Sequence, residues 1–368
     1  MLFASTKFQR LCFAILTFFL MIAWPVATSA DKNGERHLLY VATPGIRNYL
    51  EFGGHGLLVF DIDDGHKLLK RIKTSGFDKE GKPLNVKGIV ANAKTHRVFI
   101  TTTETLQSID LLTEKILWEK PYEGGTDRLA IDPNGKFIYV PSLEKDHWHV
   151  VDAATGDIIK KLVPKSGAHN TIVSLDGKWA YLAGLKSPVL NISDTSKHEI
   201  TKTVGPFSSV IRPFTINGSQ TLAYVNVNDL LGFEIGDIRT GKMLARVEVT
   251  GFQKGPTKRH GCPSHGVALT PDEKEVWIAD AFNQRVHVFD NTVMPPKQIA
   301  SLPVREQRRG RQRLRELAEP QRWQPDGERH RERVGRHVDD RGLGHPERSG
   351  SVLPGPEPTR WRQRRALR

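Results

Sequence analysis

The sequence predicts an all-β protein, a β-propeller built from four-stranded blades. Two anchors recur along the chain: an aromatic residue inside a hydrophobic strand, and an aspartate that closes the following strand. The aromatic residues are Tyr40, Phe99, Tyr139, Tyr181, Tyr224 and Trp277, and the aspartates are Asp61, Asp110, Asp152, Asp194, Asp237 and Asp290. A period of about 40–45 residues with four short strands is typical of a propeller blade. Six blades are therefore recognisable, and a seventh is expected but is missing or replaced by the C-terminal tail.

The clearest copy of the repeat spans residues 264–290. A strand beginning at Ser264 is followed by a Pro271-Asp272 turn, a second strand through Trp277, and a third strand that ends at Asp290. A polar turn and a fourth short strand follow several of the anchor aspartates. Because an aspartate side chain can accept hydrogen bonds from the backbone two residues on, the anchor aspartates are expected to cap these turns, which is a structural role.

Several segments carry a recognisable version of this repeat: Asp132-Pro133-Asn134-Gly135-Lys136-Phe137-Ile138-Tyr139-Val140, Leu175-Asp176-Gly177-Lys178-Trp179-Ala180-Tyr181, and Val276-Trp277-Ile278-Ala279. Over roughly residues 37–300 the chain resembles the YVTN-type β-propeller repeat proteins, a superfamily that includes YncE-like domains and domains like the quinoprotein amine dehydrogenase β-chain. The resemblance implies the fold. It leaves the function open, because only some of these propellers are enzymes.

The N-terminus predicts export. Lys7 and Arg10 precede an apolar run that ends at Pro25, and small residues lead to Ala30, which is the order of a cleavable signal peptide. We expect residues 1–30 to be removed after Ala30, which places the mature protein in the periplasm or outside the cell without a transmembrane span. An uncleaved membrane anchor is the alternative, although the apolar run is shorter than the roughly 20 residues that a span needs.

The predicted propeller body, residues 31–304, is followed by a segment of different composition. Residues 305–368 contain 18 arginines and no lysine, and they carry most of the chain's net charge of +13. Two interpretations remain open: a shifted reading frame that replaces the last blade, or a genuine disordered arginine-rich arm that binds polyanions. The propeller body itself is not expected to bind nucleic acid.

One column of polar residues predicts a binding site. The residue twelve positions before each of five aromatic anchors is polar, although it begins an otherwise apolar strand. The column consists of Lys87, Asp127, His169, Arg212 and His265. Because the first strand of a blade lines the central channel, these residues are expected to surround one channel mouth and to bind an unidentified protein or a small anionic ligand. The alternative is that the channel mouth is wet and simply tolerates polar residues.

A second candidate site contains the only cysteine of the predicted mature chain. His260, Cys262 and His265 lie within six residues, and this donor set would suit Cu or Zn if a further ligand came from His55, His147, His149 or His169. The sequence requires no cofactor, and a structural role for this loop is the alternative. In His147-Trp148-His149, strand alternation places both histidines on the same face, which we expect to be an exposed sheet face.

The sequence lacks a complete catalytic motif: it has no Cys-x-x-Cys-His, no phosphate-binding Gly-Lys-Ser/Thr loop, no Gly-x-Ser-x-Gly and no His-Glu-x-x-His. The first expectation is therefore an exported propeller that acts as a binding scaffold through its channel-mouth face, without catalysis. The alternative is a periplasmic oxidoreductase or metal-dependent enzyme that uses His260, Cys262, His265 and the channel histidines.

Overall fold

The computed structural model describes residues 37–43, 54–143, 145–256 and 261–304. The predicted signal peptide, the arginine-rich tail and His260 lie outside these ranges. In the described part, all regular secondary structure is β-strand, and no helix there is long and apolar enough to cross a membrane.

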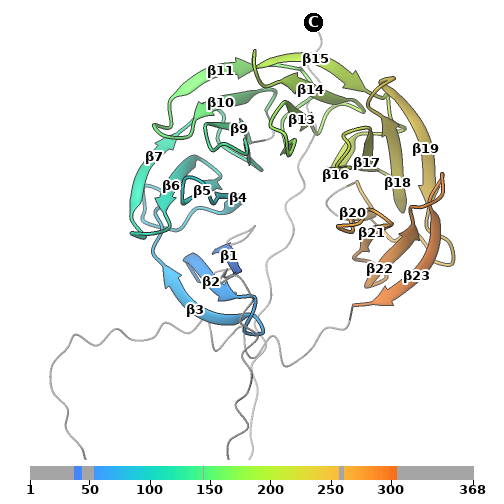
Figure 1. Cartoon of the computed structure of the whole chain (residues 1–368), viewed down its shortest axis with the longest axis horizontal. Coiled ribbons are helices and arrows are strands. Elements are labelled where there is room, and N and C mark those ends of the chain that lie inside the picture. Colours follow the sequence, from blue (N-terminus) through green and yellow to red (C-terminus); the bar gives the residue numbers. More distant parts are fainter. Residues whose placement is uncertain (1–36, 44–53, 144, 257–260, 305–368) are drawn as a thin grey trace, which may run out of the picture. The chain divides into compact units, whose positions relative to one another are not determined.

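The strands form six antiparallel sheets arranged around a common axis (Figure 1). Sheet 1 contains β1 (Leu38–Thr43), β2 (Gly56–Asp61) and β3 (Lys67–Ile72); sheet 2 contains β4 (Val86–Asn92), β5 (Arg97–Thr102), β6 (Thr105–Asp110) and β7 (Ile116–Pro121); sheet 3 contains β8 (Ala130–Ile131), β9 (Phe137–Pro141), β10 (Trp148–Asp152) and β11 (Ile158–Leu162); sheet 4 contains β12 (Asn170–Val173), β13 (Trp179–Ala183), β14 (Leu190–Asp194) and β15 (Glu199–Val204); sheet 5 contains β16 (Ile211–Ile216), β17 (Leu222–Val227), β18 (Gly232–Asp237) and β19 (Lys242–Glu248); sheet 6 contains β20 (Ser264–Leu269), β21 (Glu275–Asp280), β22 (Arg285–Asp290) and β23 (Lys297–Pro303).

Each sheet is one blade of a propeller. The first strands of neighbouring sheets contact one another, in the order β1, β4, β8, β12, β16 and β20, while the later strands of each sheet lie progressively farther from the axis (Figure 1). The predicted fold class is confirmed: the described chain is an all-β propeller with six blades.

The interfaces between neighbouring sheets share one packing pattern. The aromatic anchor of one sheet packs against the residue that precedes the aromatic anchor of the next sheet. Thus Tyr139 lies in a core cluster with Ala180, and Tyr181 lies in a cluster with Ala223. The same relationship joins Phe99 to Ile138 and Tyr224 to Val276. Burying these apolar faces against one another is the main source of the fold's stability.

At each terminal sheet, one of these two packing positions has no neighbouring sheet of the described chain against it: the aromatic anchor in sheet 6 and the residue before the anchor in sheet 1. Trp277 of sheet 6 is 38% exposed, whereas Phe99, Tyr139 and the other internal anchors are almost fully buried. On sheet 1, Leu39 is 40% exposed, whereas its equivalent Val98 is fully buried. The described residues therefore seal the faces between consecutive sheets, but they leave one apolar face of each terminal sheet open.

Irregularities in the strand pairing identify which strand sheet 1 lacks. In sheets 2 to 6, the pairing of the third and fourth strands shifts directly before the anchor aspartate, as between Ser108 and Ile109. In sheet 1 the same shift occurs between β2 and β3, before Asp61. Strand β1 is therefore equivalent to a second strand, and the described part of sheet 1 has no innermost strand.

The anchor aspartates cap turns, as predicted. Asp110 Oδ1 accepts hydrogen bonds from the backbone amides of Leu112 and Thr113, and Asp152 Oδ1 makes the equivalent contacts with Ala154 and Thr155. The other four anchor aspartates also accept a hydrogen bond from the amide two residues on. These bonds fix the turn between the third and fourth strands of each blade.

Candidate functional site

The predicted polar column coincides with irregular backbone at the start of the innermost strands. The pairing of β4 with β5 shifts at Lys87, that of β16 with β17 shifts across Arg212, and that of β20 with β21 shifts across His265. Asp127 and His169 lie just before β8 and β12. Because a β-bulge redirects a side chain away from the regular alternation, polar residues can be placed here without entering the apolar core.

Three members of the column meet in one ion-pair cluster that joins sheets 2, 3 and 4. The Asp127 side chain is fully buried; its Oδ2 lies 2.7 Å from Nδ1 of His169, and its Oδ1 lies 3.6 Å from Nζ of Lys87. A fourth member, Arg128, was not predicted from the sequence, and its Nη1 lies 2.5 Å from His169 Nε2. Arg128 directly follows Asp127 in the sequence, which could have indicated it, but the spacing from the aromatic anchors gives one residue per blade.

The contacts of His169 indicate which of its ring nitrogens carries the hydrogen. A guanidinium group can only donate hydrogen bonds, so His169 Nε2 accepts from Arg128. The proton of the neutral imidazole is therefore on Nδ1, and it is donated to Asp127. Hydrogen bonds therefore connect Arg128 through His169 to Asp127, and Lys87 lies beside the second carboxylate oxygen of Asp127. Two cations and one carboxylate leave one net positive charge.

Close backbone packing supports this cluster. A Cβ atom on Gly88, the residue after Lys87, would lie 3.1 Å from the Cα atom of Arg128 and 2.8 Å from a methyl group of Leu129. Glycine at this position therefore lets sheet 3 approach sheet 2 at the level of the cluster. Asp127 Oδ1 is buried and has no hydrogen-bond partner in the described part of the chain, so the 3.6 Å ion pair with Lys87 is its principal compensation.

The two remaining column residues have other surroundings. Arg212 Nε donates a hydrogen bond to Asn228 Oδ1 at 2.7 Å. His265 lines a hollow on the open face of sheet 6, together with Ala279 and Arg285. A role for Arg212 and His265 in the same ligand site stays a prediction.

The cysteine loop is described only in part. Cys262 is buried, and its thiol donates a hydrogen bond to the Ser264 carbonyl oxygen at 2.6 Å. Burial raises the pKa of this thiol to about 12. Since a cysteine binds a metal as the thiolate, metal binding here would have to overcome this stabilisation of the protonated form. The predicted His260, Cys262 and His265 site stays a prediction, because His260 lies outside the described residues.

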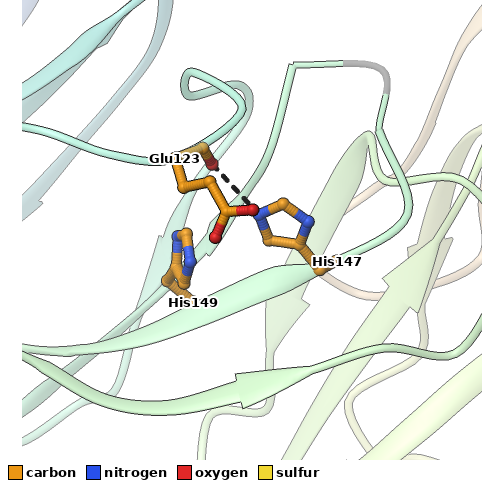
Figure 2. A group of neighbouring side chains, drawn as sticks. All are labelled: Glu123, His147 and His149. Carbon is orange, nitrogen blue, oxygen red and sulfur yellow. Dashed lines mark hydrogen bonds between the residues drawn. The ribbon is translucent and has the colours of Figure 1, made fainter.

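A different histidine group is brought together at the edge of sheet 3. His147 and His149 lie on the same face, as predicted, with ring centroids 4.7 Å apart. The expectation of an exposed face was wrong, because both residues are buried. The segment that leads from sheet 2 into sheet 3 covers this face: Tyr122 packs on His149, and Glu123 lies beside both histidines (Figure 2).

Comparisons with known proteins identify the fold. No protein-family model and no curated protein matches the chain. Hydrazine synthase of Kuenenia stuttgartiensis is similar in structure, with a TM-score of 0.51 and 19% identity over 63% of this chain and 68% of that chain. The β-propeller domain of Cps50 (Swd1) from Myceliophteria thermophila gives a TM-score of 0.52 and 12% identity over 69% of this chain and 82% of that chain. At these identities the likeness concerns architecture alone, and the chain is a six-blade β-propeller.

Proposed function

We propose that this protein is an exported propeller of the YVTN type that binds a small anionic ligand at its channel mouth. The observation that carries the proposal is the cluster of Lys87, Arg128, His169 and Asp127 at the innermost strands of three neighbouring blades. Its net charge of one positive unit favours an anion, and the surrounding low-polarity core strengthens charge interactions there.

The four residues have different roles in this proposal. Lys87 and Arg128 are partly exposed and contact the ligand, whereas Asp127 is fully buried and acts as a positioning residue. Asp127 holds Lys87 directly and holds Arg128 through His169. These contacts fix two long, flexible side chains before the ligand arrives, which reduces the entropy lost on binding.

Calorimetric titration of the full chain with inorganic phosphate and with succinate tests the binding site. Lys87→Gln and Arg128→Gln are each expected to weaken binding of the better probe by about tenfold, the effect of losing one charged hydrogen bond. Lys178→Gln is the matched control, because Lys178 is 73% exposed and pairs only with a neighbouring aspartate. Unchanged affinity in both cluster variants, or an equal loss in the control, would refute the proposed site.

Export has its own support and its own test. The charged start, apolar run and small residues that end at Ala30 carry this part of the proposal. N-terminal sequencing of the protein recovered from its native host is expected to begin at Asp31, and a protein that retains residues 1–30 would contradict cleavage.

A further inference from the structure

We propose that Glu123, His147 and His149 bind a divalent transition-metal ion. One ligand atom from each of the three side chains lies within 4.8 Å of the other two. Glu123 follows β7, His147 directly precedes β10, and His149 is the second residue of β10. Figure 2 shows the carboxylate of Glu123 beside the two imidazole rings.

The backbone brings the three donors together. Residues two apart on a strand point to the same face, which places His147 beside His149. Gly124 has a φ of +81°, and a Cβ atom there would lie 3.1 Å from Cε1 of His147. The turn therefore lies directly against the imidazole ring, in a conformation that favours glycine. This close approach sets Glu123 at the histidine pair.

His147 has the second contact that is usual for a metal ligand. Its Nε2 lies 3.0 Å from the carbonyl oxygen of Glu123, and since a carbonyl can only accept, Nε2 carries the proton. Nδ1 then has a free lone pair. A metal-binding histidine commonly donates its other ring N–H to a backbone carbonyl, which fixes both its tautomer and its orientation.

His149 supplies the independent observation. The residue is 2% exposed, and its Nδ1 is buried without a hydrogen-bond partner in the described part of the chain. A buried polar atom without a partner is costly, and a bound metal ion would remove that cost.

Glu123 provides the anionic ligand and the route of entry. Its side chain is 73% exposed, and one carboxylate oxygen pairs with Lys161 Nζ at 2.8 Å. A metal ion can therefore reach this carboxylate from solvent and displace Lys161. Two imidazoles and one carboxylate suit zinc or another first-row ion and leave a coordination position open. Binding requires the ligand atoms to close to separations of about 3.3 Å, given ligand distances of about 2 Å.

The proposed metal site is separate from the anion cluster, although both lie at the same end of sheet 3. The Asp127 amide donates to the Pro141 carbonyl oxygen, and Pro141 is paired with Trp148 on the other side of β9. The two sites therefore flank one strand. The metal site also differs from the Cys262 loop, which belongs to sheet 6.

The test is a titration of the metal-stripped full chain with Zn²⁺ alone, followed by calorimetry and elemental analysis. We expect one tightly bound equivalent, and we expect Glu123→Gln and His149→Phe to weaken it at least about tenfold. Glu123 is exposed, so Glu123→Gln tests the site without endangering the fold. His198→Phe is the control, because His198 is buried but bonds to Tyr139 instead.

Two outcomes would overturn the proposal. The first is zinc binding that is unchanged in Glu123→Gln and His149→Phe. The second is zinc binding that is lost in Cys262→Ser, which would assign the metal to the cysteine loop. Co²⁺ in place of Zn²⁺ gives a second readout: a site made of two imidazoles and a carboxylate produces visible absorption bands without the thiolate charge-transfer band that a cysteine ligand adds.

Discussion

His169 Nδ1 lies 2.7 Å from Asp127 Oδ2, although the two residues are 42 positions apart and belong to neighbouring blades. The contact links one blade to the next beside the innermost strands, where the interface is polar instead of aromatic. It places a buried carboxylate between Lys87 on one side and the His169–Arg128 pair on the other. The stability of the inner strands and the geometry of the proposed anion site therefore depend on the same carboxylate.

Replacing that carboxylate is expected to destabilise the fold. Asp127→Asn leaves the Lys87 ammonium, on a side chain that is only 12% exposed, without its counter-charge, which should lower the free energy of unfolding by about 3 kcal/mol. Urea denaturation measures the change. Asp146→Asn, which removes a carboxylate 52% exposed from its pair with Lys186, should cost less than about 1 kcal/mol. Equal effects of the two substitutions would show that the buried pair contributes nothing beyond a surface pair.

The open face of sheet 6 predicts unequal effects at equivalent aromatic positions. Tyr181→Ala removes a ring from a sealed interface and should lower the free energy of unfolding by about 3–5 kcal/mol. Trp277→Ala should cost only about 1 kcal/mol, because Trp277 is 38% exposed and its indole N–H bonds to Glu275 on the same strand. Urea denaturation of the two variants measures the change in the free energy of unfolding. A larger decrease for Trp277→Ala than for Tyr181→Ala would mean that the Trp277 face is covered in solution.

The turn before sheet 3 should require glycine at position 125. Gly125 has a φ of +72°, and a Cβ atom there would overlap the carbonyl oxygen of Thr103. Gly125→Ala should therefore destabilise the protein by about 3 kcal/mol. Gly81→Ala is the matched control, because Gly81 has a φ of +77° with no atom within 4 Å of the added methyl group. Its cost of about 1 kcal/mol measures the backbone conformation alone. Thermal unfolding of both variants separates the steric clash from the conformational strain.

The Cys262 thiol should be unreactive in the native protein. Burial raises its pKa to about 12, so the thiolate, which is the reactive species, is scarce between pH 7 and 9. Iodoacetamide should modify Cys262 only after unfolding in urea, as followed by peptide mass spectrometry. Rapid alkylation of the folded chain at pH 8 would show that the loop opens, and it would favour the predicted metal site at Cys262.

The blades could be predicted from sequence because their two anchors have separate physical causes. The aromatic anchor is required by the interface with the next blade, and the aspartate is required by the turn after the third strand. The spacing of twelve residues before the aromatic anchor also indicated Lys87, Asp127 and His169, because these equivalent positions of neighbouring blades lie together beside the innermost strands. This spacing could not indicate Arg128, which reaches the cluster through the length of its side chain.

The metal group could not be predicted because it depends on a contact between blades. Alternation placed His147 and His149 on one face, but it contained no information on what covers that face. The covering segment comes from the connection between sheets 2 and 3, where Gly124 turns the backbone onto the imidazole of His147. The position of Glu123 is therefore a property of the assembled interface and not of either strand.

The exposed faces at Leu39 and Trp277 make the described sheets a stack with two ends. An internal sheet loses two interfaces when it unfolds, whereas sheet 1 and sheet 6 each lose one. Local unfolding should therefore begin at the two terminal sheets and proceed toward the middle sheets. Amide hydrogen exchange is expected to be fastest in β1–β3 and β20–β23 and slowest in sheets 3 and 4. The anion cluster and the proposed metal ligands lie in or next to sheets 2 to 4, toward the slowly exchanging middle of the chain. Both sites should therefore stay folded when either terminal sheet unfolds.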